Sequence, residues 1–215
     1  LAAFVNEVEK HSPFKKKMLP EVSAMFSTLA PYAPFGLRFV FGNLWLFGPL
    51  LKKLLPSMSA QAGAMLKTTV AFTTMSGSDA YNVIPQEASV GANMRFIPHQ
   101  GEKESLEIIK GLAKKYGLET EVIHSNDYTP PVDINGDAFR LVEDTVAKTF
   151  LGLVSSPYVM TGATDAQFYQ PICKSCIRFA PVIYGPEQMK GMHGLNECIE
   201  YNCLPGAVRF YQNLI

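Results

Sequence analysis

The chain has 215 residues, which is enough for one large domain or two small ones. Hydrophobic residues make up 47% of it and charged residues 18%, a composition that fits a globular protein and argues against disorder. Basic and acidic residues number 19 each, so the formal net charge is zero, and we expect no general attraction to nucleic acid or to an anionic membrane.

Cysteines are too sparse for a disulfide scaffold, since only Cys173, Cys176, Cys198 and Cys203 occur. The first two form a CxxC motif, so a zinc site of four thiolates is one open alternative, although the second pair lacks the spacing of a zinc ribbon. Free thiols in a reducing compartment are the simpler interpretation, and they favour the cytoplasm. The chain opens at Leu1 with neither an initiator methionine nor a basic secretory leader, which suggests a fragment.

The first third of the chain predicts helices. Residues 1–10 have helical periodicity that ends before Pro13. Residues 13–56 are rich in Pro, Phe and Leu and predict several short helices, broken at Pro20, Pro31, Pro34 and Pro49. Because an exposed loop would not carry so many large apolar side chains, this region should be buried or face a partner. Its most apolar stretch, residues 35–51, falls short of a membrane span.

A strand pattern follows. Residues 67–75 form a β-branched and aromatic run, and residues 77–79 read as a turn. Residues 87–97 alternate between apolar and polar, which predicts a half-buried strand. Its inward face would comprise Ala88, Val90, Ala92, Met94 and Phe96. Residues 103–116 predict an amphipathic helix with Gly117 as its C-cap, and residues 118–124 predict a short strand.

The rest of the chain predicts a second part. Residues 126–135 contain two prolines and read as a linker, and residues 136–151 predict an amphipathic helix. Short buried strands are expected at 158–160 and 176–179, and a closing helix at 204–215 with Pro205 in its first turn. We therefore predict an α+β sandwich over residues 1–125, with a helical Pro-rich insertion at about 13–64, and a piece of an α/β layer over residues 126–215.

Few residues stand out as candidates for chemistry. His193 lies in a glycine-bracketed loop, residues 191–197, of the kind that places side chains at the active edge of an α/β sheet. Gly162-Ala163-Thr164-Asp165 follows a predicted strand, where small residues let backbone amides approach an anion. An ordinary turn with Asp165 as N-cap explains that stretch equally well. Asn82 and Arg95 are candidates to bind a carboxylate or a carbonyl, or are a turn residue and a solvated charge.

These segments together carry a resemblance. Thr68-Thr69-Val70, Asn82-Val83-Ile84-Pro85 and residues 92–96 resemble the lid, or dimerisation, domain of the M20 metallopeptidases. Gly162-Ala163-Thr164-Asp165, Arg178-Phe179 and residues 193–197 resemble the C-terminal end of that family's catalytic domain. Residues 3–9, Ser12-Pro13-Phe14 and the Pro-rich insertion are most similar to the branch of carboxypeptidase S and the N-acyl-amino-acid amidohydrolases.

The resemblance implies a ferredoxin-like lid whose first strand is missing, followed by the C-terminal part of an α/β zinc-exopeptidase catalytic domain. The family's two zinc ions polarise the amide carbonyl of a small peptide or an N-acyl amino acid and activate a water for attack. By the resemblance, His193 is a zinc ligand, and Asn82 and Arg95 reach from the lid to the substrate. A homodimer through the lid is also implied.

By the same resemblance, Gly162, Ala163 and Thr164 line the pocket for the substrate carboxylate. Gln167 departs from the family, since many relatives have an arginine there, and its loss weakens bidentate recognition of that carboxylate.

The family's other metal ligands and its glutamate base are expected upstream of residue 1, so this chain should contain no catalytic base. A catalytic zinc needs about three protein ligands, which one histidine does not supply. We therefore predict that the isolated chain does not hydrolyse substrate. The same reasoning predicts a three-stranded remnant of the lid sheet with an exposed edge. The alternative function is a non-catalytic dimerisation or binding module.

Overall fold

The computed structural model describes all 215 residues, except for the side chain of Met58. The chain divides into two compact units. Unit 1 comprises Leu1–Pro131 together with Tyr158–Gly162, and unit 2 comprises Val132–Pro157 together with Ala163–Ile215. This division rests on compactness, so the assignment of residues 1–125 to a lid and 126–215 to a catalytic domain stays a prediction.

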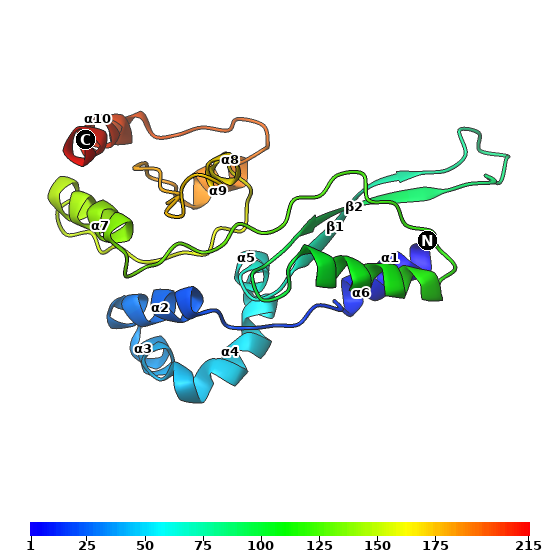
Figure 1. Cartoon of the computed structure of the whole chain (residues 1–215), viewed down its shortest axis with the longest axis horizontal. Helices are drawn as coiled ribbons and strands as arrows, with labels where there is room; N and C mark the ends of the chain where they lie inside the picture. The colour runs from blue at the N-terminus through cyan, green and yellow to red at the C-terminus, as the bar shows by residue number, and fades with distance from the viewer. The chain divides into compact units, whose positions relative to one another are not determined.

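Unit 1 combines helices with one hairpin (Figure 1). Its elements are α1 (Ala2–Lys10), α2 (Pro20–Leu29), η1 (Ala30–Tyr32), α3 (Phe35–Gly42), α4 (Leu44–Met58), α5 (Ala60–Ala64), β1 (Thr69–Ser76), β2 (Ser89–Arg95) and α6 (Glu102–Lys115). Unit 2 contains α7 (Asp137–Thr149), α8 (Ala166–Tyr169), α9 (Pro186–Gly191), η2 (Tyr201–Cys203) and α10 (Leu204–Leu214).

The two strands of unit 1 pair antiparallel, from Thr69 opposite Arg95 to Ser76 opposite Ser89. The register shifts between Phe72 and Thr74, which leaves one residue of β1 outside the ladder as in a β-bulge. Helices α1 and α6 pack against this hairpin (Figure 1), because Phe4 and Val8 of α1 and Ala113 of α6 form a buried cluster with residues of β1. The rings of Phe4 and Phe72 meet edge to face, with centroids 5.7 Å apart.

Helix α6 forms for the reasons that its sequence indicated. Acidic residues occupy its first turn and Lys114 and Lys115 its last, as the helix dipole favours. Gly117 has a φ of +68°, and the amides of Gly117 and Leu118 donate to the carbonyls of Lys114 (3.0 Å) and Ala113 (3.1 Å). This pair of hydrogen bonds is a Schellman motif, which confirms the predicted C-cap.

A second apolar cluster holds the insertion to the rest of unit 1. Side chains from α2 and α4 bury one another with those of Leu66 and Ile97. The members are Leu19, Val22, Met25, Phe26, Leu51, Leu55, Met65, Leu66 and Ile97. The prediction of short helices separated by prolines is right at Pro20, Pro31 and Pro34, and wrong at Pro49. That residue lies inside α4, where it is exposed, so water has access to the backbone there.

The predicted third strand at 118–124 is wrong. Most of this segment is exposed and it has no ladder partner among the residues the structure describes, and a strand needs a partner for its backbone groups. The sheet therefore has two strands rather than three. The alternation of β2 is also weaker than expected, because Val90 and Met94 are half-buried whereas Ala92 is exposed.

Unit 2 is centred on the pairing of α7 with α10. Phe210 of α10 is 1% exposed, and its ring lies 4.9 Å from that of Phe179 and 6.4 Å from that of Phe150. Asn213 donates a hydrogen bond to the hydroxyl of Thr149 at 2.9 Å, which joins the two helices at their ends. Both helices and the place of Pro205 in the first turn confirm the sequence-based expectation.

The short strands predicted at 158–160 and 176–179 are wrong, because neither segment pairs with another strand in the part of the chain that the structure covers. Val159 instead packs against the cluster of α2 and α4. The apolar character that suggested buried strands therefore reflects side-chain packing without a backbone ladder. Among the described helices, none has the length and the apolar content that crossing a membrane requires.

Candidate functional site

Asn82 and Arg95 lie at opposite ends of the β1–β2 hairpin. Asn82 is exposed in the connection between the strands, and Arg95 is the exposed last residue of β2, opposite the first residue of β1. A strand rises about 3.3 Å per residue, so the seven residues of β2 separate the two ends by roughly 20 Å. The structure therefore does not bring these two predicted substrate residues to one place.

His193 occupies an exposed turn of unit 2 that follows α9. Its φ is +59° and that of Asn196 is +61°, a left-handed conformation that side chains other than glycine adopt at a cost. The amide of Gly194 donates to the carbonyl of Gly191 at 2.8 Å and closes the turn. The glycine-bracketed loop is thus tightly turned, and it presents the imidazole to solvent.

The structure places no group of metal ligands around His193 in the part of the chain that it describes. Within the described residues, no three His, Cys, Asp or Glu side chains are grouped so as to hold a metal ion. The residues present therefore do not fit the family's zinc site. The same finding counts against the alternative of a zinc site formed by the four cysteines, all of which are free thiols.

The CxxC motif places its two thiols side by side. Cys176 Sγ donates to the carbonyl of Cys173 at 3.2 Å. Burial raises the pKa of the Cys176 thiol, the neighbouring Cys173 raises it further, and the charge of Arg178 opposes both effects. The thiolate is the form that binds metal or attacks a disulfide, and a raised pKa disfavours that form at Cys176.

Gly162 and Ala163 are exposed, and Thr164 is half-buried where α8 begins. Asp165 occupies the N-cap position, as predicted, although its carboxylate makes no cap hydrogen bond. The amides of Gln167 and Phe168 already donate to the carbonyls of Thr164 (3.2 Å) and Asp165 (3.0 Å), so they are not free for an anion. The stretch is a tight turn into a four-residue helix, and the amides of Gln167 and Phe168 are used within that turn.

Two buried polar atoms of unit 2 have no hydrogen-bond partner among the described residues. They are the Thr164 hydroxyl oxygen and Arg178 Nη2. A buried guanidinium nitrogen without an acceptor is costly, and a carboxylate would satisfy it. The sequence identified Thr164 but gave Arg178 no role, because an arginine in a predicted strand is indistinguishable from a solvated charge. Arg178 is the functional candidate that the structure adds.

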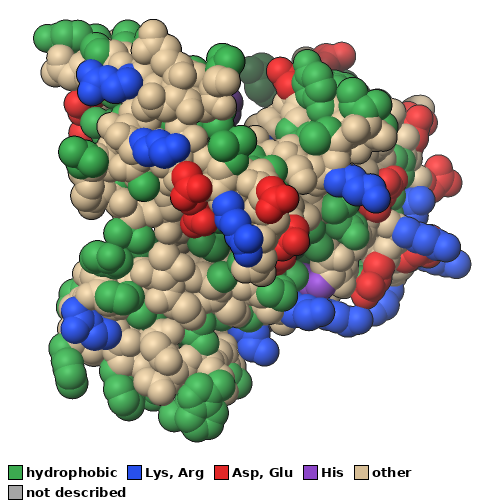
Figure 2. Space-filling view, turned by 60° about the vertical axis from the view of Figure 1, so that its left-hand side comes forward, with side chains coloured by type: hydrophobic (Ala, Val, Ile, Leu, Met, Phe, Trp, Pro, Cys, Tyr) green, Lys and Arg blue, Asp and Glu red, His purple; other side chains and the backbone are tan. Residues whose placement is uncertain are grey.

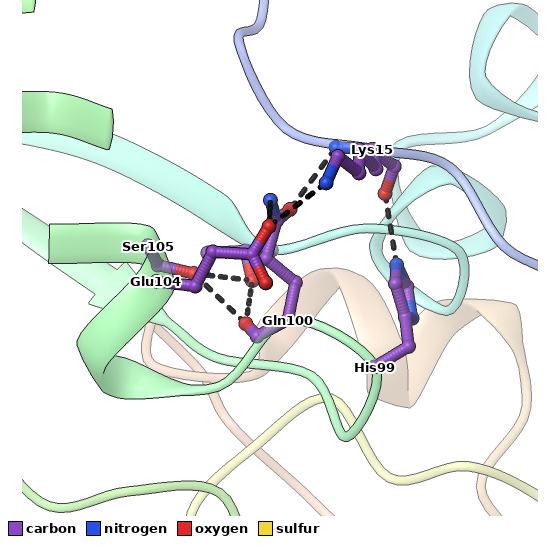
Figure 3. Close-up of polar contacts among 6 residues, drawn as sticks. Lys15, His99, Gln100, Glu104 and Ser105 are labelled. Atoms are coloured by element: carbon purple, nitrogen blue, oxygen red, sulfur yellow. Dashed lines mark hydrogen bonds and ion pairs between the residues drawn. The ribbon is translucent and has the colours of Figure 1, made fainter. Parts of the chain in front are cut away.

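Unit 1 contains a polar cluster around Gln100 that the sequence did not predict (Figure 3). The side-chain oxygen of Gln100 accepts from the backbone amide of Lys15 at 3.0 Å, and the side-chain nitrogen of Gln100 donates to Glu104 at 3.2 Å. The Lys15 ammonium lies 3.0 Å from the same Glu104 carboxylate. His99 Nε2 donates to the carbonyl of Lys15 at 2.9 Å, since a carbonyl can only accept.

Beneath this cluster, two buried hydroxyls share one acceptor. The hydroxyls of Thr68 and Ser105 donate to the carbonyl of Gln100 at 3.0 and 2.8 Å. Thr68 and Ser105 are 0% exposed, and Gln100 is 1% exposed. The whole cluster fastens the segment after α1 to the start of α6, so its role is structural. A helical wheel would have placed Ser105 inward, but a serine gives no hydrophobic signal.

The Lys15–Glu104 pair predicts a specific dependence of stability on pH. The Lys15 and Gln100 hydrogen bonds lower the pKa of the Glu104 carboxyl from its usual value near 4.5. A lowered carboxyl pKa stabilises the fold above the unfolded-state pKa, and that contribution is lost as pH falls through the folded-state pKa. We expect Glu104→Gln to have a lower unfolding free energy than the natural chain above the usual carboxyl pKa, and the difference to shrink as pH falls through the lowered folded-state pKa.

Urea unfolding of both proteins across that pH range measures the difference. Glu107→Gln in the same helix is the control, because Glu107 is exposed and the described contacts give it no ion pair. A Glu104→Gln difference that stays constant down to pH 3 would contradict the prediction.

Comparison with known proteins supplies the family. Residues 15–215 match the profile of Peptidase family M20/M25/M40. The chain belongs to this family. It is 32% identical over 223 residues to an N-fatty-acyl-amino acid synthase/hydrolase, PM20D1, of Xenopus tropicalis, a match that covers 100% of the chain and 42% of the relative.

Two further relatives are named for other activities. A probable carboxypeptidase S-like 2 of Dictyostelium discoideum is 27% identical over 100% of the chain and 41% of its own length. A succinyl-diaminopimelate desuccinylase of Xanthomonas campestris is 27% identical over 65% of the chain and 35% of its own length. The chain therefore spans about two fifths of the length of those relatives that match all of it. No solved structure matches.

Proposed function

We propose that this chain is the C-terminal part of an M20 amidohydrolase that cleaves the amide bond of N-acyl amino acids or small peptides. The family match over residues 15–215 supports the reaction class, since hydrolases of this kind are named among its relatives. In this proposal unit 1 is the lid, a ferredoxin-like fold of which the β1–β2 hairpin and α6 are part, and it is the dimerisation surface.

Within unit 2, we assign Thr164 and Arg178 to the substrate carboxylate. The observation that carries this assignment is the pair of buried polar atoms without partners, the Thr164 hydroxyl and Arg178 Nη2. A carboxylate accepts from both, and an arginine holds it through charge-assisted hydrogen bonds. Arg178 would take over the role that the family gives to an arginine at position 167, where this chain has glutamine.

The remaining predicted residues keep their roles as part of the proposal. Gly162 and Ala163 line the same carboxylate pocket, and His193 is one metal ligand. Asn82 and Arg95 belong to the lid, and because they lie at opposite ends of the hairpin, only one of them contacts a small substrate at a given site. The residues of this chain do not complete a zinc site, so the remaining ligands and the general base would come from upstream sequence or from another chain. The isolated chain should therefore bind substrate without turning it over.

The carboxylate assignment is tested by calorimetric titration of the chain with a short-chain N-acyl amino acid and with its amide, which lacks the carboxylate. We expect binding of the acid only, and Arg178→Met should weaken it by roughly 10- to 100-fold, the loss of about 1.5–3 kcal/mol from a hydrogen bond to a charged group. Arg209→Met is the matched control, because Arg209 is an exposed arginine of the same unit.

Equal loss in the two arginine variants, or equal binding of acid and amide, would remove Arg178 from the proposal. The reaction class has a separate test, the release of free amino acid by the product of the complete gene and by the 215-residue chain. Hydrolysis by the complete product alone supports the proposal, whereas hydrolysis by the purified 215-residue chain contradicts the need for upstream residues.

A further inference from the structure

The helices of the insertion carry large apolar side chains on both sides. One side of α4 packs into the core of unit 1 through Leu51 and Leu55. The outward side is exposed, and Phe35 and Trp45 are 85% and 81% accessible to solvent. We call this outward side the α3–α4 surface. Its apolar members are Tyr32, Phe35, Leu37, Phe39, Trp45, Leu46, Leu50 and Leu54, and its basic members are Arg38, Lys52 and Lys53.

Every charge on this surface is positive. From Val22 to Ser78 the sequence contains no Asp or Glu, although acidic and basic residues balance over the whole chain. The lowest part of Figure 2 lies at the height of α3 and α4 in Figure 1, and on the face shown it carries green and blue side chains without red ones. The neutrality of the whole chain therefore conceals a local surface that is apolar and cationic.

The spacing on α4 aligns these side chains. Leu46, Leu50 and Leu54 recur every four residues and form a row along the exposed side of the helix, with Lys53 beside them. Trp45 and Lys52 lie along the neighbouring row and line a shallow groove between α2 and α4. With 8 and 15 residues, α3 and α4 are too short to cross a bilayer. An exposed helix face that combines aromatic, aliphatic and basic side chains is typical of helices that lie in the plane of a membrane interface.

We propose that the α3–α4 surface docks on an anionic lipid bilayer, with its apolar side chains in the interface and its basic residues at the lipid headgroups. Aromatic side chains, and tryptophan above all, favour this interface, and each basic residue near an anionic leaflet adds attraction. A second copy of the chain fits less well, because a two-fold contact would bring the positive charges of Arg38, Lys52 and Lys53 close to the same charges of the other copy. This inference does not depend on the proposed hydrolase activity.

The chain contains a fluorescent probe on this surface, because Trp45 is its single tryptophan and is 81% exposed. The 215-residue chain would be titrated with vesicles of phosphatidylcholine containing phosphatidylserine and with vesicles of phosphatidylcholine alone. We expect a blue shift of Trp45 emission and quenching by brominated acyl chains with the anionic vesicles, and a much smaller response with the neutral ones.

Variants assign the binding to the surface. The Lys52→Gln/Lys53→Gln protein should partition roughly 25-fold more weakly, since each basic residue contributes about five-fold. Leu46→Ser/Leu50→Ser should bind at least tenfold more weakly. The controls are Lys114→Gln/Lys115→Gln, exposed on α6, and Leu151→Ser/Leu153→Ser, exposed in unit 2, which should bind as the natural chain does.

Three results would overturn the proposal. The first is unchanged Trp45 emission with both kinds of vesicle. The second is a shift that is equal for neutral and anionic vesicles and indifferent to Lys52→Gln/Lys53→Gln. The third is a blue shift that depends on protein concentration without lipid and is lost in Leu46→Ser/Leu50→Ser, which would assign the surface to a second copy of the chain.

Discussion

Replacing Phe210 by alanine is expected to destabilise unit 2 by about 3–5 kcal/mol, the range for truncating a buried phenylalanine. Phe210 is 1% exposed and contacts the rings of Phe150, Phe179 and Tyr211. Its removal would leave a cavity between α7 and α10 that the neighbouring rings can fill only in part. Because folded domains retain about 5–15 kcal/mol of net stability, this loss is a large fraction of the total.

Hydrogen exchange followed by mass spectrometry shows which helices lose stability. In Phe210→Ala the amides of α7 and α10 should lose protection, and Phe210→Leu should lose much less. Val208→Ala is the control on the same helix, because Val208 is 58% exposed. If Val208→Ala and Phe210→Ala lose protection equally, the aromatic cluster does not hold unit 2 together.

Replacing Leu66 by alanine should destabilise unit 1 by about 2–5 kcal/mol, the range for a buried leucine. Leu66 is 0% exposed and belongs to the cluster that joins α2 to α4. Its carbonyl also accepts a hydrogen bond from the amide of Lys17 at 2.8 Å. A cavity at this point therefore loosens both the insertion and the segment that leads into it.

The same exchange measurement should show lost protection in α2 and α4 of Leu66→Ala. Leu50→Ala is the matched control, since Leu50 lies on the outward side of α4 and is 50% exposed, so its truncation should change stability little. Protection in α2 and α4 that is the same in Leu66→Ala as in Leu50→Ala would show that the cluster is not the core of the insertion.

The elements that could be predicted share a strong local signal. Helix α6 combines apolar spacing, charges matched to its dipole and Gly117 at its end, and each of these acts within a few residues. The β1–β2 hairpin follows from β-branched content around a turn. Strands at 118–124, 158–160 and 176–179 were wrong because a strand exists only with a partner, and no local pattern reports whether a partner is present.

The candidate site shows the same limit. The ordered motifs of the lid and of residues 162–165 and 193–197 identified the family, which the match over residues 15–215 confirms. Geometry then decided what the motifs could not. Asn82 and Arg95 lie at opposite ends of one hairpin, and Arg178 has a buried nitrogen without a partner. Whether a polar atom is buried depends on segments that are distant in the sequence, so composition and motif spacing do not predict it.

The sequence by itself determined the family, the principal helices, the hairpin and the neutral net charge, because each of these is local or a sum over residues. Only the tertiary structure decided which side chains are buried, that Gln100, Ser105 and Thr68 form a closed polar cluster, and that the apolar and basic residues of α3 and α4 face outward. The physical reason is that burial and hydrogen bonding join segments that are far apart in the chain, such as Lys15 and Gln100, which are separated by 85 residues.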